Sequence, residues 1–184
     1  MADLTTPKPP TEKTEARRFV YAAVMSAIVM SLLTLLVIVL IQRGRLGEVD
    51  GPLLEAARAR WQAAGIDSYE LELSITGHQQ DEYRIIVRDG EVSRFERNGQ
   101  PLQRRHAFQA WGIEGMLETI GRDLDNRRRY RLGERGPQIC NLYLQGRFHE
   151  KLGYPQEYIR MERGGQASNP AISWKVTSFS ILSR

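Results

Sequence analysis

The longest uncharged stretch of the chain, residues 19–41, constrains the fold more than any other feature of the sequence. It contains 23 residues without a charged side chain, and most of them are Leu, Ile, Val, Ala or Met. A helix of that length measures about 34 Å at ~1.5 Å per residue, whereas the hydrocarbon core of a bilayer is roughly 30 Å thick. A helix that is apolar on every side has no face to present to water. The pattern therefore predicts a single N-terminal transmembrane helix at residues 19–41.

A cleaved signal peptide is the main alternative for this stretch. The apolar region of a signal peptide is typically ~7–15 residues long and ends at small residues. This stretch is longer and is followed by Gln42 and Arg43, so we expect an uncleaved anchor. Basic residues flank it on both sides in similar number. The adjacent pair Arg17 and Arg18, together with the length of the C-terminal part, favours a cytoplasmic N-terminus and an extracytoplasmic C-terminal domain.

Small residues recur at a spacing of four within this stretch, at Ala23, Ala27 and Ser31. On a helix they form one stripe, and small side chains let two membrane helices approach closely. The spacing predicts helix–helix contact in the membrane at these positions. Small residues are also common in any membrane helix, so the oligomeric state stays open.

The remaining sequence divides by composition into three segments. Residues 1–18 are rich in Pro, Thr and charged residues and are predicted to be a disordered tail. Residues 42–50 form a polar linker, and residues 51–184 are long enough for one domain with its own core. The net charge is +4 with a sequence pI near 9.4, and the single cysteine, Cys140, excludes an internal disulfide.

Hydrophobic periodicity predicts an α+β fold for residues 51–184. Helical spacing covers residues 52–65 and 113–124, whereas alternating apolar residues mark strands at 68–76, 82–88, 91–97, 100–103, 138–145, 157–162 and 172–182. Asp89-Gly90 and Asn98-Gly99 are typical of tight hairpin turns. Changes of parity between Val92 and Phe95, and near Ser178, predict β-bulges. We expect an antiparallel sheet that begins as a meander and is covered by the two helices.

Several short motifs of this domain are similar to a known family: Trp61 with Gly65, Ser68-Tyr69, Val87-Arg88-Asp89-Gly90 and Gly153-Tyr154-Pro155. They resemble the bacterial family called domain of unknown function 6174, over roughly residues 53–182. The resemblance implies a small envelope or secreted domain. Many relatives carry a close cysteine pair after the Ser-Tyr strand, whereas residues 77–81 of this chain contain none. The family has no established catalytic residue, so the resemblance assigns none here.

Residue spacings typical of catalytic and metal sites are missing from the sequence. His78, His106 and His149 are far apart, and no zinc-type Cys or His pair, nucleophile elbow or phosphate-binding loop is present. Cys140 lies in an apolar strand pattern and is predicted to be a core residue. We therefore predict no catalytic residue, no metal site and no cofactor.

The basic run at residues 122–135 is the one pattern with a binding mechanism. It places six arginines within 14 residues. Guanidinium groups bind phosphate and carboxylate groups through two parallel hydrogen bonds. The run predicts contacts with an anion or a lipid headgroup at Arg127, Arg128, Arg129 and Arg131. The alternative is a solvated helix end at which arginine complements the helix dipole.

Together these patterns predict a non-enzymatic binding domain that a single-pass helix holds at the inner (plasma) membrane, facing outside the cytoplasm. The expected partners are the lipid bilayer and an envelope protein or anionic polymer, whereas nucleic acid is out of reach there. Two alternatives remain. One is an unrecognised enzyme acting at the membrane surface, and the other is a module that binds anionic lipid or polymer through residues 122–135.

Overall fold

The computed structural model describes residues 25–37, 46–77, 79–102, 108–136, 139–163 and 171–183 of the 184-residue chain. The chain divides into two units after Arg45. The described part of the first unit is a helix of residues 25–37, whose side chains are exposed. The second unit begins at Leu46 and contains the described strands and the helices α2, η2 and α3.

The predicted fold class was wrong in its first element, the transmembrane helix at residues 19–41. Within the described ranges, no helix combines the length and the hydropathy that crossing a membrane requires. Ala27 and Ser31 lie on this helix with exposed side chains, and Ala23 lies outside the described residues. The tail at residues 1–18 also lies outside them.

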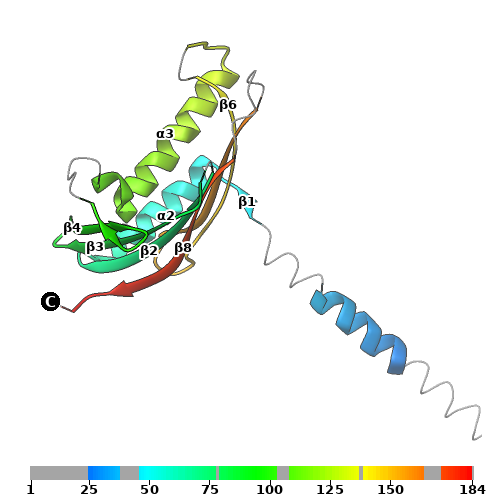
Figure 1. Cartoon of the computed structure of the whole chain (residues 1–184). Helices are drawn as coiled ribbons and strands as arrows, with labels where there is room; N and C mark the ends of the chain where they lie inside the picture. Colours follow the sequence, from blue (N-terminus) through cyan, green and yellow to red (C-terminus); the bar gives the residue numbers. More distant parts are fainter. Residues whose placement is uncertain are drawn as a thin grey trace, which may run out of the picture. The chain divides into compact units, whose positions relative to one another are not determined.

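The second unit is built on one eight-stranded antiparallel sheet with the strand order β1-β6-β7-β8-β2-β3-β4-β5. Consecutive strands β2 to β5 form a meander, and β8 joins that meander to the hairpin of β6 and β7 (Figure 1). The strands are β1 (Gly47–Glu48), β2 (Tyr69–Thr76), β3 (Asp81–Arg88), β4 (Glu91–Arg97), β5 (Gln100–Pro101), β6 (Asn141–Phe148), β7 (Pro155–Arg163) and β8 (Ile172–Ile181).

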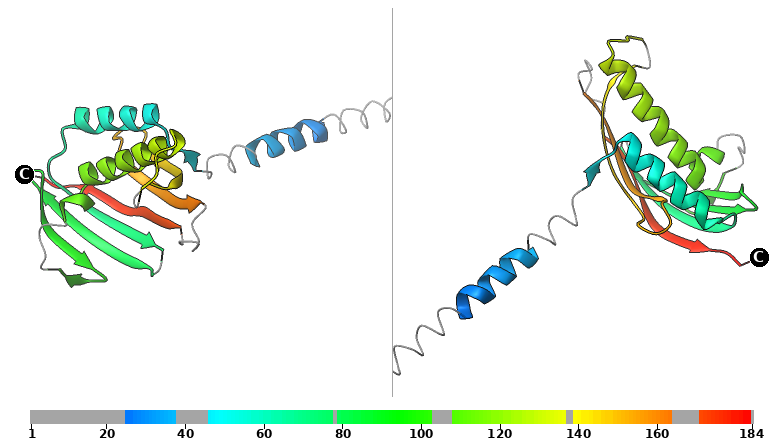
Figure 2. Two further views of the ribbon diagram at one scale, coloured as in Figure 1. Left: turned by 90° about the horizontal axis from the view of Figure 1, so that it is seen from above. Right: turned by 180° about the vertical axis from the view of Figure 1, so that it is seen from behind.

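Two helices, α2 (Gly51–Ala64) and α3 (Ile113–Arg131), lie over the same face of the sheet (Figure 2). Asp50 caps the start of α2, because its carboxylate accepts a hydrogen bond from the Leu53 N–H at 2.9 Å. Gly65 ends that helix in the left-handed conformation with φ 58°, which glycine adopts without steric cost. The short 3₁₀ helix η2 (Gln109–Trp111) leads directly into α3.

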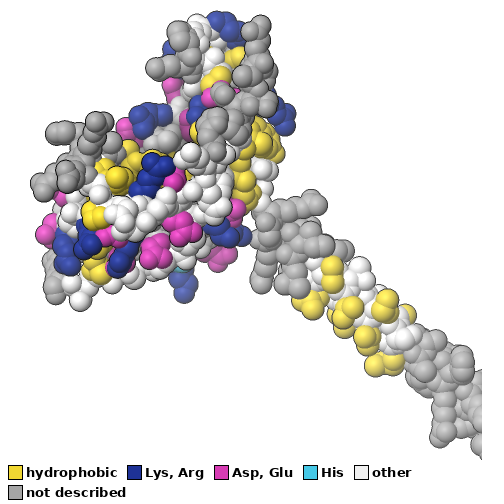
Figure 3. Space-filling view, viewed as in Figure 1, with side chains coloured by type: hydrophobic (Ala, Val, Ile, Leu, Met, Phe, Trp, Pro, Cys, Tyr) yellow, Lys and Arg dark blue, Asp and Glu magenta, His cyan; other side chains and the backbone are white. Residues whose placement is uncertain are grey.

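Alternation in the strands separates the core from the outer face of the sheet. Tyr69, Leu71 and Leu73 of β2 are buried beneath the helices, whereas Glu70 and Glu72 lie on the opposite face. Arg84 of β3 donates a hydrogen bond of 2.6 Å from Nε to Glu70 Oε1 across that outer face. Acidic and basic side chains are interspersed on the surface that Figure 3 displays. Both signs of charge on the outer face are typical of a solvated antiparallel sheet.

Both predicted bulges are present. The register of β3 with β4 shifts between Ile86 and Val87, and the register of β2 with β8 shifts between Glu72 and Leu73. Each shift inserts one extra residue, so apolar residues of opposite parity in β4 and in β8 reach the same face. The core therefore continues along both strands despite the break in their alternation.

Some predicted boundaries were wrong. The second helix continues to Arg131, seven residues beyond the predicted end at Leu124. The strand predicted at residues 138–145 runs instead over Asn141–Phe148. The segment predicted as a linker up to residue 50 contributes strand β1, which pairs with β6. A strand of two residues is too short to carry a periodic pattern, so no periodicity marked β1 in the sequence.

Candidate functional site

The basic run lies within helix α3, and the helical period divides it between two sides of that helix. Arg127, Arg128 and Arg131 line a groove between α2 and α3, whereas Arg122 and Arg129 line an adjoining hollow that shares Arg58, Gly121 and Asp125 with the groove. Residues three or four apart share a helix face, so neighbours in the sequence point in different directions. Three of the four predicted contact residues therefore line one groove, and Arg129 does not.

Arg127 is buried and is part of the domain's own structure. Its side chain is 8% exposed, and Nη1 donates to Glu48 Oε1 at 2.8 Å. Its Nη2 donates to the carbonyl oxygen of Val49 at 2.9 Å. These hydrogen bonds join α3 to β1 and its following residue. Arg127 is therefore not among the residues that we propose to contact a ligand.

The groove between α2 and α3 has a volume of about 470 Å³. Its apolar lining comes from Leu54 of α2, from Leu124 of α3 and from Leu132 directly after α3. Four arginines and two acidic residues, Glu55 and Asp125, supply its charges. Basic and hydrophobic side chains lie close together around the C-terminal end of α3 in the space-filling view (Figure 3). The groove thus combines an apolar surface with an excess of positive charge.

Arg128 and Arg131 are the arginines of this groove that remain open to solvent. Both side chains are exposed, and Arg131 is 67% exposed. Arg131 approaches Glu48 Oε1 at 3.9 Å, the outer limit of an ion pair, and no ion pair joins Arg128 to another described residue. Exposed ion pairs are worth about 1 kcal/mol or less, so Arg131 can exchange Glu48 for another anion at small cost.

Arg58 bridges the two helices, and sequence reasoning missed it. Its Nη1 donates to Glu55 Oε1 at 2.7 Å, and its Nη2 donates to the carbonyl of Leu117 at 3.2 Å. A Cβ at Gly121 would lie 2.5 Å from Arg58 Nη2, so the glycine makes room for the guanidinium. A glycine inside the predicted helix indicated that another group comes close to α3 at that position, but the sequence did not identify that group as the Arg58 side chain.

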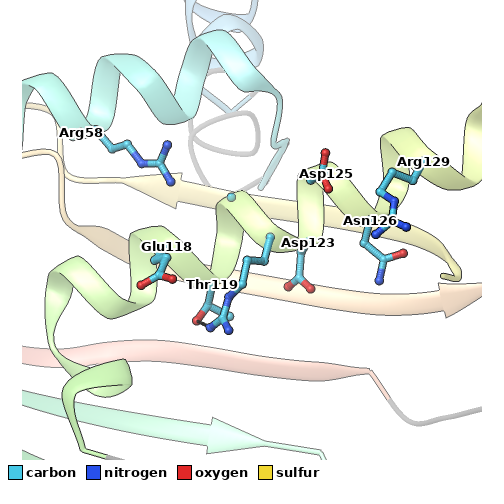
Figure 4. Close-up of a pocket in the computed structure, with 9 residues that line it drawn as sticks. Arg58, Glu118, Thr119, Asp123, Asp125, Asn126 and Arg129 are labelled. Carbon is cyan, nitrogen blue, oxygen red and sulfur yellow. Dashed lines mark hydrogen bonds between the residues drawn. The ribbon is translucent and has the colours of Figure 1, made fainter. Parts of the chain in front are cut away.

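A second hollow, of about 610 Å³, lies beside α3 and is drawn in Figure 4. Arg58 reaches toward it from α2, and the other labelled side chains project from α3 in Figure 4. Its charges are mixed, because Arg122 and Arg129 share it with acidic residues, and Arg129 Nε donates to Glu134 Oε2 at 2.8 Å. This balance of charge gives the second hollow less capacity for an anion than the groove.

Asp123 is an acidic residue of the second hollow that the sheet contacts. Burial raises its pKa, although the Tyr158 hydroxyl donates to its Oδ2 at 2.8 Å and Arg160 Nε lies 3.3 Å from its Oδ1. The pKa of Tyr158 is also raised, first by burial and then by the Asp123 charge. Both carboxylate oxygens already have partners from β7. The arrangement is that of a buried polar contact between helix and sheet.

Most motif residues of the family resemblance are buried, whereas Gly65 at the end of α2 and Arg88-Asp89-Gly90 at the hairpin are exposed. Trp61 Nε1 donates to Glu114 Oε1 at 2.6 Å, and the Tyr69 hydroxyl donates to Glu114 Oε2 at 3.3 Å. Burial, followed by the charge of Glu114, raises the pKa of Tyr69. Gly153 has φ 78°, and a Cβ there would collide with the carbonyl of Ala57. These residues position α2, α3 and the sheet relative to one another.

The remaining candidates for chemistry lie apart. His149 Nδ1 accepts a hydrogen bond from the Leu152 N–H at 3.0 Å, and its ring stacks on Tyr154. His78 and His106 lie outside the described residues. Cys140 is half-buried, and burial raises the pKa of its thiol. Among the side chains that the structure describes, no group of three or more His, Cys, Asp or Glu could hold a metal ion.

Comparison with known proteins supports the family resemblance over part of the chain. The profile of a family of unknown function, DUF6174, matches residues 53–131, which run from α2 to the end of α3. This stretch contains the Trp61, Tyr69 and Glu114 contacts and most of the groove. No curated protein and no solved structure is significantly similar to the chain.

Proposed function

We propose that this domain is a non-enzymatic binding module whose α2–α3 groove holds an anionic group of a partner. The observation that carries the proposal is the position of Arg128 and Arg131. Both guanidinium groups are exposed beside an apolar groove, and neither is held by a close ion pair to a described residue. Paired donors of this kind suit a carboxylate or a phosphate.

The other charges of the groove support this assignment. Glu55 is engaged by Arg58 at 2.7 Å, and Glu48 is engaged by the buried Arg127 at 2.8 Å. Their charges therefore oppose an incoming anion less than free carboxylates would. Asp125 is the other acidic residue that lines the groove. The local balance favours an anion near Arg128 and Arg131.

The alternative that the domain is an enzyme has less support. The second hollow contains Asp123 with a raised pKa, but Tyr158 and Arg160 of the domain itself engage that carboxylate. A carboxylate that acts as a general base needs an oxygen within hydrogen-bond reach of a substrate proton, whereas both oxygens of Asp123 contact β7.

The position of the domain outside the cytoplasm and the identity of its partner stay predictions.

Binding of labelled polyglutamate and of inorganic polyphosphate to the full chain tests the proposal. The double variant R128Q/R131Q should weaken binding about 5- to 10-fold, as expected for two exposed charged contacts, and should reduce its salt dependence. The control variant R88Q/K175Q removes the same charge from exposed strand positions. Equal losses in the two variants would reduce the effect to net charge and contradict the proposal.

A further inference from the structure

Leu132 is the most exposed large hydrophobic side chain in the described part of the chain, at 69%. It directly follows α3, and its N–H donates to the carbonyl of Arg128 at 3.0 Å. The backbone makes this contact, so the end of the helix does not require leucine at this position. The side chain is thus left as apolar surface beside the arginines, at the rim of the groove.

The groove presents a defined combination of chemical groups. Leu132 and the half-buried Leu124 lie with Arg128 and Arg131 along one side of α3, and Leu54 faces them from α2. An occupant complementary to this surface carries an apolar group flanked by negative charges. Inorganic polyphosphate has no apolar group. A planar bilayer surface does not enter a hollow between two helices, whereas a protein segment supplies both kinds of group.

We infer that the partner of the groove is an acidic, amphipathic segment of another protein. The inference rests on the proposed function and specifies its partner. The segment would place an apolar side chain against Leu132 and Leu124, and two carboxylates about one helical turn apart near Arg128 and Arg131. The excess of arginine over acidic residues in the groove supplies the charge complementarity.

Three synthetic 12-residue helical peptides test this assignment against the full chain. The first carries two glutamates four residues apart with a leucine between them. The second replaces that leucine with glutamine, and the third replaces both glutamates with glutamine. Wild-type protein should bind the first peptide roughly 10-fold more tightly than the second, as expected for one buried leucine side chain. It should bind the third about 5- to 10-fold more weakly than the first, as expected for the loss of two exposed charged contacts.

The variant L132Q should remove the preference for the first peptide over the second. The control I172Q changes another exposed apolar residue, 41% exposed at the start of β8, and should keep the preference. Circular dichroism and urea unfolding should be the same for both variants, because both side chains are exposed.

The possible outcomes separate the two proposals. If R128Q/R131Q weakens polyglutamate binding but L132Q leaves the peptide preference intact, the proposed function stands and the inference about the partner is overturned. If R128Q/R131Q binds polyglutamate as the wild type does, the proposed function fails. Binding to phosphatidylglycerol vesicles that depends on Leu132, without binding to any peptide, would assign the surface to lipid and overturn the inference.

Discussion

Trp61 and Glu114 join the two helices through a hydrogen bond of 2.6 Å from the indole Nε1 to the carboxylate Oε1. Glu114 lies in the first turn of α3, where a negative charge also complements the helix dipole. Its second oxygen accepts from the hydroxyl of Tyr69, whose own oxygen accepts from the Ile113 N–H at 2.8 Å. The start of α3 is thereby fixed to both α2 and the sheet.

Removing the Glu114 carboxylate should therefore destabilise the domain. E114A leaves the Trp61 Nε1 without its acceptor and should lower the free energy of unfolding by about 2 kcal/mol, the scale of a hydrogen bond to a charged group. Urea unfolding measures the change. The control E118A removes an exposed carboxylate one turn later and should change stability by less than about 0.5 kcal/mol. Similar losses in both variants would show that the contact with Trp61 contributes little.

Arg127 and Arg128 are neighbours in the sequence and should respond differently to the same substitution. R127A leaves the Val49 carbonyl unpaired, and we expect a loss of about 2–3 kcal/mol in the free energy of unfolding. The loss should stay at this level because Glu48 is 55% exposed and water can solvate it. R128A should change stability by less than about 0.5 kcal/mol and should weaken anion binding instead. Urea unfolding together with polyglutamate binding separates the two roles.

Two glycines of α3 should differ in their tolerance of alanine. A Cβ at Gly115 would collide with the backbone of Gln109 and Ala110, so G115A should cost about 1–3 kcal/mol. A Cβ at Gly121 meets the flexible end of the Arg58 side chain. There, a gain of about 1 kcal/mol in helix propensity should offset the lost hydrogen bond, so G121A should be close to neutral. Thermal unfolding of the two variants checks the order, and a larger loss for G121A would contradict it.

Asp81 should contribute to the acid sensitivity of the domain. Hydrogen bonding from Arg97 lowers the pKa of Asp81 from its ordinary value of 3.8. The unfolded chain then binds the proton more tightly, so this contribution to stability is complete above the ordinary pKa. It is lost as the pH falls through the lower value of the folded state. The carboxyl ¹³C resonance of Asp81 should titrate at higher pH in R97Q than in the wild type, whereas R94Q should leave it unchanged.

The sequence predicted which helices and strands are present better than it predicted where each of them begins and ends. Asp89-Gly90 and Asn98-Gly99 form the tight turns, and all four residues have positive φ. Alternation identified β2 and β3 because one face of each is buried. The end of α3 was misplaced because the apolar pattern stops at Leu124, whereas arginine is a good helix former and Arg127 continues the contact with the domain.

The arrangement of the basic run was not predictable from the sequence. The density of arginine at residues 122–135 indicated anion binding, but the sequence order grouped Arg127, Arg128 and Arg129 into one patch. In the structure Arg127 is buried, Arg128 lines the groove and Arg129 pairs with Glu134. Arg58 and Leu132 join the groove through tertiary packing, which a local pattern does not encode.

The outermost strands of the sheet, β1 and β5, are each two residues long, and β5 ends in Pro101. Short terminal strands and proline leave few backbone donors and acceptors for an additional strand, which protects against edge-to-edge aggregation. Strand addition from another molecule is accordingly disfavoured at β1 and β5 themselves. The proposed recognition through the α2–α3 groove uses side chains instead, and these can change by substitution without altering the hydrogen-bonded framework of the sheet.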